Sequence, residues 1–162
     1  MVKKKILLNL LIVFSIFFLD RASKIYILNI AESDGLVEIT VNSFLNIILV
    51  WNSGIGFGLL QFDKALAYNI ITALIVIINI IIIYILFQSK GFQKFLFAMI
   101  LGGSLGNLFD RIYYSAVPDF IDLNYNGYHW FVFNVADIFI SIGIICLIFS
   151  EFIFYKKKNN EK

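Results

Sequence analysis

The sequence predicts an α-helical membrane protein with four transmembrane helices and a small extracytoplasmic β-sheet element. Of its 162 residues, 60% are hydrophobic and only 15% are charged, whereas soluble domains are about 45–50% apolar. Four apolar stretches are each long enough to cross a hydrocarbon layer of about 30 Å, and lysines gather at alternate ends of these stretches. The chain length leaves room for one domain, so residues 1–162 are expected to form a single membrane domain.

The predicted spans cover approximately residues 6–28, 67–87, 95–114 and 133–155. Lysines precede the first span, separate the second from the third, and follow the fourth: Lys3, Lys4, Lys5, Lys90, Lys94, Lys156, Lys157 and Lys158. Basic residues are retained on the cytoplasmic side. Both termini are therefore expected in the cytoplasm, with residues 29–66 and 115–132 as outward loops.

The first span could alternatively be a cleavable signal peptide, because it follows lysines and has an apolar centre. It lacks a small-x-small cleavage site, however, and the charged run Asp20-Arg-Ala-Ser-Lys24 occupies the region where cleavage would occur. A retained membrane helix is the preferred interpretation.

The first outward loop contains a hairpin pattern. Leu36–Val41 and Phe44–Trp51 are rich in Val, Ile, Thr and Phe, and Asn42-Ser43 separates them. A two-stranded sheet is only marginally stable alone, so it is expected to rest on the membrane surface or on the helix ends. A short surface helix is expected near Phe62 to Leu66.

The composition argues against several classes of function. Cys146 and His129 are the only residues of their kinds, so neither an internal disulfide nor a zinc site built from thiolates and imidazoles is expected. The net charge of +2 is too small to indicate nucleic-acid binding. No metal ion and no other cofactor is predicted.

Ionisable side chains within membrane spans are costly and indicate function by default. They lie toward the predicted outer ends of the first, third and fourth spans: Asp20, Arg21, Lys24, Asp110, Arg111 and Asp137. Odd-numbered spans end on the outer side and even-numbered spans begin there, so these residues should converge at one depth. Asp119, in the second outward loop, is tethered at the same level.

Two carboxylates held close together in a pocket of low dielectric cannot both ionise, so one becomes an acid and the other a base. Such a pair can hydrolyse a peptide bond without a covalent intermediate. Asn107-Leu-Phe-Asp110 and Asn134-Val-Ala-Asp137 repeat an Asn-x-x-Asp pattern, which on a helix places amide and carboxylate on one face. From the residues alone, either Asp110 or Asp119 could be the second member of the pair.

Five separated motifs carry a specific resemblance. They are Asp20-Arg-Ala-Ser-Lys24, Asn52-Ser-Gly-Ile-Gly-Phe-Gly58, Gly102-Gly-Ser-Leu-Gly-Asn-Leu-Phe-Asp-Arg111, Val117-Pro-Asp-Phe-Ile121 and Phe133-Asn-Val-Ala-Asp137. In this order, and over nearly its whole length, the chain resembles the lipoprotein signal peptidase (signal peptidase II) family. Ser23 stands where Thr is frequent, and Gly56 where Ala is common.

The resemblance implies an aspartyl endopeptidase of the bacterial inner membrane with Asp119 and Asp137 as its catalytic dyad. The implied supporting residues are Asp20, Lys24, Asn52, Gly54, Asn107, Asp110, Arg111, Asn134 and Ala136. The implied substrate is a prolipoprotein whose cysteine carries diacylglycerol, with cleavage just before that cysteine at the extracytoplasmic face. A monomer surrounded by membrane lipids, without nucleic acid, is expected.

Physical features agree with this choice of dyad. Asp110 adjoins Arg111 and lies within helical reach of Asn107, which suits a permanently charged support. Asp119 has no adjacent base, which suits a carboxyl group whose proton must move, although an aspartate is also an ordinary turn residue.

Several of these residues also have a purely structural interpretation. Asp20 and Lys24 could form a simple i,i+4 salt bridge, and Asn52 with Gly54 a plain tight turn. Asn107, Arg111 and Asn134 could be polar links between helices, and Gly102 with Gly106 a packing motif. Ser104 matches a Gly-x-Ser-x-Gly nucleophile signature, but it lies within a predicted membrane helix rather than a strand-to-helix turn, so the match is interpreted as accidental.

Two other functions use the same residues. A small transporter would employ the carboxylates as an ion relay, but it predicts charges spread in depth or helices broken at the midplane. A membrane assembly protein would use Gly102 and Gly106 as its interface, and it leaves the polar residues of the spans without a role.

Overall fold

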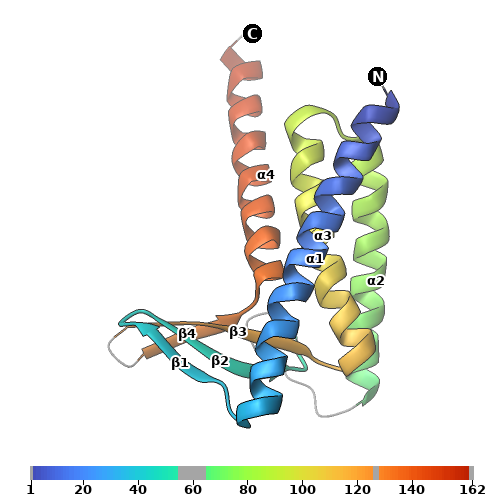
Figure 1. Cartoon of the computed structure of the whole chain (residues 1–162). Coiled ribbons are helices and arrows are strands. Elements are labelled where there is room, and N and C mark those ends of the chain that lie inside the picture. Colours follow the sequence, from blue (N-terminus) through green and yellow to red (C-terminus); the bar gives the residue numbers. More distant parts are fainter. Residues whose placement is uncertain (1, 55–64, 126–127, 161–162) are drawn as a thin grey trace.

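The computed structural model consists of long helices and one antiparallel sheet (Figure 1). The structure describes residues 2–54, 65–125 and 128–160. The helices within these residues are α1 (Val2–Asp34), α2 (Ala65–Gln88), α3 (Gly91–Tyr114) and α4 (Val135–Asn160). The strands are β1 (Glu38–Asn42), β2 (Leu45–Asn52), β3 (Val117–Tyr125) and β4 (Tyr128–Phe133).

Each of the four helices contains a segment long and apolar enough to cross a membrane. These segments are Ile6–Asp34, Tyr68–Gln88, Gly91–Tyr114 and Val135–Phe152. The predicted membrane fold with four spans is therefore confirmed. The surface helix expected near Phe62 to Leu66 lies largely outside the described residues, and Leu66 itself belongs to α2.

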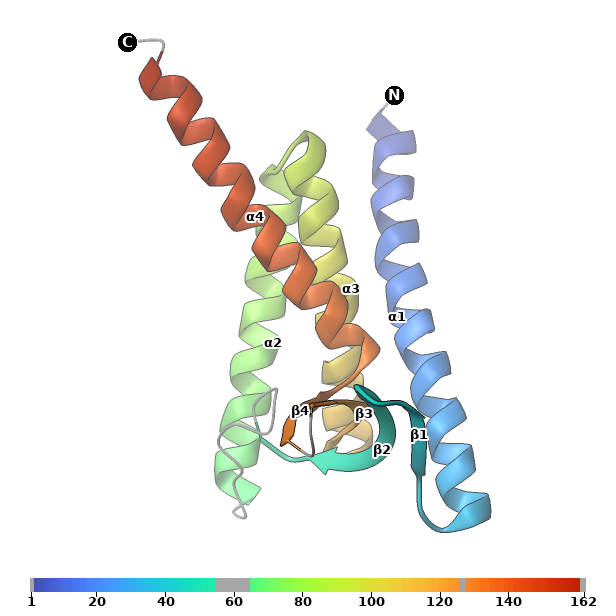
Figure 2. The same ribbon diagram turned by 90° about the vertical axis from the view of Figure 1, so that its left-hand side faces the viewer.

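The sheet lies at one end of the helical bundle, whereas the start of α1 and the end of α4 lie at the other end (Figures 1 and 2). Helices α1 and α3 run toward the sheet, and α4 starts from it. The end of α1, the end of α3 and the first turn of α4 are consequently neighbours. These are the segments that carry the polar residues singled out in the sequence.

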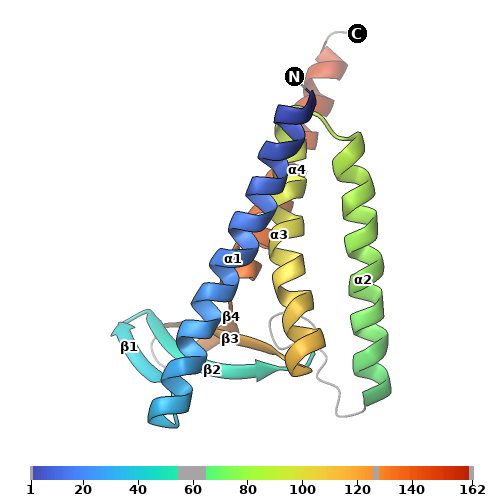
Figure 3. The same ribbon diagram turned by 45° about the vertical axis from the view of Figure 1, so that its right-hand side comes forward.

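Helix α3 is the centre of the bundle and packs against the other three helices (Figure 3). Its glycines permit close approach. A Cβ atom on Gly102 would lie 2.9 Å from the Cβ of Ile16 in α1, and one on Gly103 would lie 2.6 Å from the carbonyl oxygen of Ala136 in α4. The packing interpretation of Gly102 is confirmed. Gly106 instead leaves room for the carboxylate of Asp20, which is 2.5 Å from a Cβ built there.

Helix α1 ends six residues beyond the predicted first span, which was placed at residues 6–28. Gly35 ends it with a φ of +78°, and its N–H donates to the carbonyl of Ala31 at 3.0 Å, as in a glycine-terminated helix. The added turn is stabilised because Ile30 and Ala31 pack against the buried cluster that contains Phe120 of the sheet. The segment between α1 and α2 therefore begins at Gly35 rather than at residue 29.

The predicted hairpin is confirmed as β1 and β2, which pair antiparallel. The side chain of Asn42 accepts a hydrogen bond from the N–H of Phe44 at 2.8 Å, and this local bond closes the turn.

Strands were predicted only in the first outward loop, but the segment taken as the second outward loop also contributes two strands to the sheet. Residues 117–125 and 128–133 form β3 and β4, so the sheet has four strands in the order β1-β2-β3-β4. Pro118 and two aspartates interrupt the apolar alternation by which a strand is recognised. Pairing with β2 overrides that weak local signal, and it sets Val50 opposite Asp119.

Candidate active site

Four aspartates come together at the sheet end of the bundle, each from a different element. Asp20 lies on α1, Asp110 on α3, Asp119 on β3 and Asp137 on α4. Their side chains are buried, and none of the four residues is more than 9% exposed. Buried carboxylates require compensating hydrogen bonds or charges, and the four obtain them in two different ways.

Asp20 and Asp110 form an ionic cluster with two cations. The buried ammonium of Lys24 donates to Oδ2 of Asp20 at 2.8 Å and lies 2.6 Å from Oδ2 of Asp110. Arg21 pairs with Oδ1 of Asp110. The i,i+4 salt bridge foreseen between Asp20 and Lys24 is therefore present, and it is one part of a larger network.

Asp110 has partners other than those expected from its neighbours in the sequence. Its cations come from α1, whereas Arg111 donates to the carbonyl oxygen of Gly54. Consecutive helical residues project about 100° apart because a turn takes 3.6 residues. Arg111 therefore faces a different neighbour from Asp110, and adjacency in the sequence was misleading here.

Helix α4 begins with a reciprocal pair of hydrogen bonds between Asn134 and Asp137. Asn134 Oδ1 accepts from the N–H of Asp137, and Asp137 Oδ2 accepts from the N–H of Asn134, each at 3.1 Å. This is the geometry of a capping box, with Asn and Asp in place of the usual pair. The N–H of Ala136 donates to Oδ1 of Asp20 at 2.9 Å. The first turn of α4 therefore holds Asp137 in one orientation.

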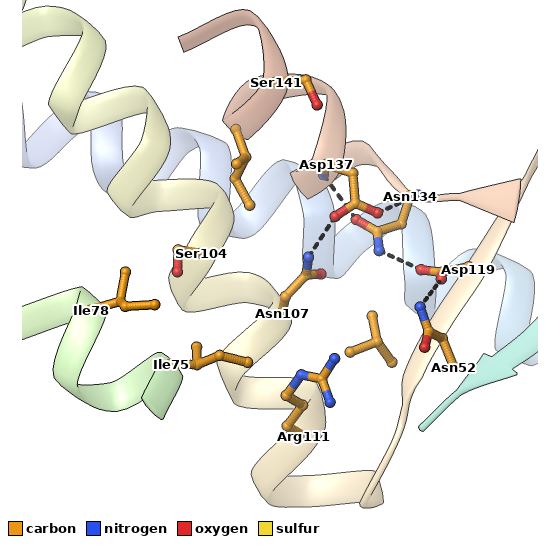
Figure 4. A pocket seen from close by; sticks show the side chains of 12 residues that line it. Asn52, Ile75, Ile78, Ser104, Asn107, Arg111, Asp119, Asn134, Asp137 and Ser141 are labelled. Carbon is orange, nitrogen blue, oxygen red and sulfur yellow. Dashed lines mark hydrogen bonds between the residues drawn. The ribbon is translucent and has the colours of Figure 1, made fainter. Parts of the chain in front are cut away.

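Asp119 is held by two side-chain amides. Asn52 Nδ2 donates to its Oδ2 at 2.8 Å, and Asn134 Nδ2 donates to its Oδ1 at 2.6 Å. Asn134 thus contacts both Asp119 and Asp137 (Figure 4). The pKa of Asp119 is raised to about 6. Burial is the largest cause and the negative charge of Asp137 adds to it, whereas the hydrogen bonds from the two asparagines and the charge of Lys24 oppose the shift.

Asn107 connects the ionic cluster to Asp137. Its Oδ1 accepts from Lys24 at 2.8 Å, and its Nδ2 donates to Oδ1 of Asp137 at 2.8 Å. Since the ammonium can only donate, the amide orientation of Asn107 is fixed. Asn107 and Asp110, the first Asn-x-x-Asp pair, lie on one face of α3 as predicted. They contact Lys24 of α1 rather than each other.

A cavity of about 250 Å³ adjoins Asp119 and Asp137, and its walls come from α2, α3, α4 and the sheet. Ile75 and Ile78 provide an apolar side (Figure 4). Arg111 also lines the cavity, and its buried Nε and Nη1 have no hydrogen-bond partner among the described residues. The cavity therefore combines two carboxyl groups, unused guanidinium donors and an apolar wall.

Comparison with known proteins decides the family. A model described as signal peptidase (SPase) II matches residues 12–153. The lipoprotein signal peptidase of Pelagibacter ubique (strain HTCC1062) is 52% identical over 98% of this chain and 96% of its own length. The chain belongs to the signal peptidase II family. The lipoprotein signal peptidase of Wigglesworthia glossinidia brevipalpis is 40% identical over 89% of this chain and 94% of its own length.

Solved structures agree with the membership in the signal peptidase II family. A bacterial membrane enzyme superposes with a TM-score of 0.72 at 30% identity, covering 95% of this chain and 91% of that one. A second bacterial membrane enzyme gives a TM-score of 0.66 at 30% identity, covering 88% and 90% of the two chains. The resemblance found in the motifs is confirmed, and the chain is a peptidase.

Most residues singled out for the signal peptidase II site come together around the cavity. Asn52 donates to Asp119 and also accepts from the N–H of Gly54 at 2.9 Å, so the predicted tight turn is present beside the contact with the carboxyl group. Gly56 and Gly58 lie outside the described residues. Ser104, which matched the nucleophile signature, lies within α3. The sole histidine, His129, lies 2.7 Å from Asp122 rather than beside Ser104.

The sequence did not single out two features of this signal peptidase II fold. Asp122 is fully buried and pairs with His129 across β3 and β4, and it also accepts from Asn46 at 3.2 Å. Ser141 lines the cavity beside Asp119 and Asp137 from α4. Its position four residues after Asp137, among apolar neighbours, is the signal that could have identified it.

Proposed function

We propose that this chain is an aspartyl endopeptidase that removes the signal peptide from diacylglyceryl-modified prolipoproteins, cutting just before the lipidated cysteine. The names of its relatives support the substrate class. The observation that carries the mechanism is the pair Asp119 and Asp137, joined by Asn134 and facing one cavity. No covalent intermediate is required with such a pair.

The reaction needs one ionised and one protonated carboxyl group. The ionised member takes a proton from a water molecule, whose oxygen attacks the scissile carbonyl carbon, while the protonated member donates to the carbonyl oxygen. The tetrahedral intermediate then breaks its C–N bond. The carboxyl group that took the proton from the water gives it to the leaving nitrogen, and the other carboxylate recovers its proton from the hydroxyl group as the carbonyl reforms. Asp119 is suited to hold the shared proton, because its pKa is raised to about 6.

Arg111 is suited to bind the substrate backbone. Its Nε and Nη1 are buried beside the cavity without a partner in the described part of the chain, and guanidinium groups bind carbonyl oxygens in a fixed geometry. A lipidated substrate would keep its acyl chains in the bilayer. That remote binding energy would position the scissile bond at the dyad.

The topology belongs to the proposal as well. We place the sheet on the extracytoplasmic face of the bacterial inner membrane and both termini in the cytoplasm, with the active monomer as one domain. Lys90 and Lys94 support this orientation, because they lie where α2 meets α3, away from the sheet. Aromatic residues near the sheet end fit an interfacial belt: Trp51, Tyr113, Tyr114, Tyr125, Tyr128 and Trp130.

Transport is the less favoured function for the same carboxylates. Transport sites lie near the bilayer midplane at broken helices. Here α1, α3 and α4 are continuous, and the four aspartates gather at one end of them. Hydrolysis at a membrane boundary fits this arrangement better than an ion path through the bundle.

Cleavage of a purified prolipoprotein tests the proposal. The wild-type protein in detergent should convert a diacylglyceryl-modified substrate to a signal peptide and a product whose first residue is the lipidated cysteine, identified by mass spectrometry. The same substrate without the lipid should be cut far more slowly. Cleavage at another bond, or equal rates with and without the lipid, would contradict the proposed specificity.

A further inference from the structure

The dyad cavity extends beyond the aspartates, away from the sheet. Ser104 lies three residues before Asn107 on α3, and Ser141 lies four residues after Asp137 on α4. With a rise of about 1.5 Å per helical residue, both serines stand roughly 5 Å further from the sheet than the dyad. Both line the cavity, from different helices (Figure 4).

The hydroxyl groups of Ser104 and Ser141 differ from those of most other helical serines. Ser23, Ser33 and Ser150 donate to carbonyl oxygens of their own helices, at 2.7 to 3.1 Å. Ser104 and Ser141 form no hydrogen bond with any described residue. Both are half-buried, whereas Ser15, which also forms no hydrogen bond with a described residue, is exposed. The walls near them are apolar, with contributions from Ile75, Ile78 and Ile140. Two polar groups are thus presented to the inside of an apolar cleft.

A membrane-embedded substrate needs hydrogen-bond partners for its backbone at this depth. A peptide bond within an α-helix hydrogen-bonds internally, so the segment at the scissile bond must leave the helix to reach the dyad. The last turn of a helix has carbonyl groups without partners, and unpaired backbone groups are costly in hydrocarbon. Some group in the cleft has to satisfy them.

We propose that Ser104 and Ser141 bind backbone groups of the signal peptide just before the scissile bond. The inference rests on the proposed function and adds a second substrate-binding point to the dyad. About 5 Å corresponds to one or two residues of extended chain, at roughly 3.3 Å each. A hydroxyl can both donate and accept, so binding to the backbone does not depend on the side chains of the signal peptide.

Alanine variants give the first measurement. Ser104→Ala and Ser141→Ala should each lower kcat/KM for a diacylglyceryl-modified prolipoprotein roughly two- to tenfold, as expected for one hydrogen bond, and Ser141→Thr should retain activity. Ser89→Ala is the control, because that hydroxyl follows the end of α2 and donates to the carbonyl oxygen of Ile85 outside the cavity. Unchanged kcat/KM in the double variant overturns the proposal.

A substrate with an altered backbone distinguishes a direct hydrogen bond to the serines from an indirect effect of the alanine substitutions on packing. Replacing one amide by an ester, one to three residues before the scissile bond, removes an N–H and weakens a carbonyl acceptor. At one of these positions the ester should slow the wild-type enzyme several-fold more than it slows the Ser104→Ala/Ser141→Ala variant. Equal slowing of both proteins at every position overturns the inference, whereas absence of cleavage by the wild type would instead reject the proposed function.

Discussion

Two pairs of buried aspartates lie at the same end of the bundle, yet their surroundings differ. Asp20 and Asp110 are matched by cations, because Lys24 contacts both and Arg21 pairs with Asp110. Asp119 and Asp137 are held chiefly by neutral groups, namely amide and backbone N–H groups of Asn52, Asn107 and Asn134. Burial is similar in both pairs, so the difference lies in the partners.

The difference shows how one cluster of acids can serve two purposes. A carboxylate that contacts a buried cation is kept charged, and removing either partner leaves an uncompensated charge. A carboxylate held by amides has its position fixed without direct contact with a cation, so it can exchange a proton. Asn107 joins the two pairs, because it contacts Lys24 on one side and Asp137 on the other.

The largest expected effect is on catalysis by the amide-held pair. Asp119→Asn and Asp137→Asn should each reduce kcat by on the order of 10³-fold or more, since each removes a general acid or base. Cleavage of a lipidated prolipoprotein measures the loss, and the elution profile and melting temperature of the detergent-purified protein control for folding. Full activity in either variant would remove that residue from the dyad.

Removing the cation from the cation-held pair should lower the stability of the protein. Lys24→Met leaves Asp20 and Asp110 without their shared ammonium, and breaking a buried ion pair costs about 3–5 kcal/mol. The melting temperature of the purified protein should fall markedly. Lys94→Met is a suitable control, since Lys94 lies at the other end of α3. A Lys24→Met protein as stable as the wild type would show that the cluster contributes little to folding.

Local spacing explains which contacts could be predicted. Asp20 and Lys24 were paired from their i,i+4 separation, and the structure has them at 2.8 Å. The Asn134–Asp137 pair was placed on one face, and it forms the capping box of α4. Such contacts depend on the helix alone. The four spans were likewise visible as runs of apolar residues, each long enough to cross the bilayer.

Contacts between segments far apart in the sequence could not be predicted from local residue patterns. The strand containing Asp119 has its partner in β2, and Asp110 takes its cations from α1 rather than from Arg111. Both arrangements depend on tertiary packing, which the local sequence does not encode. The choice of Asp119 over Asp110 accordingly came from the family motifs, and the contrast in their partners now gives it a physical basis.

The raised pKa of Asp119 predicts how stability depends on pH. Because its pKa is about 6 in the folded protein and near 3.8 in the unfolded chain, the folded state binds this proton more tightly. The contribution is fully present below pH 4 and is lost as the pH rises through 6, a fall of about 3 kcal/mol in the free energy of unfolding. Melting temperatures between pH 4 and pH 8 should therefore decline more steeply in the wild type than in Asp119→Asn. Parallel curves would contradict the raised pKa.

A smaller effect on catalysis than that of the dyad variants concerns the link between the two pairs. Asn107→Ala removes one N–H donor from Asp137 and one acceptor from Lys24, but it leaves both carboxyl groups of the dyad in place. Hydrogen bonds to charged groups contribute about 1.5–3 kcal/mol, so kcat should fall roughly 10- to 100-fold, less than for a dyad variant. Kinetics over a range of substrate concentrations would separate kcat from KM. A loss as large as that of Asp137→Asn would contradict this expectation. Asn107 would then take part in the chemistry itself, rather than only linking the charged support to the amide-held dyad.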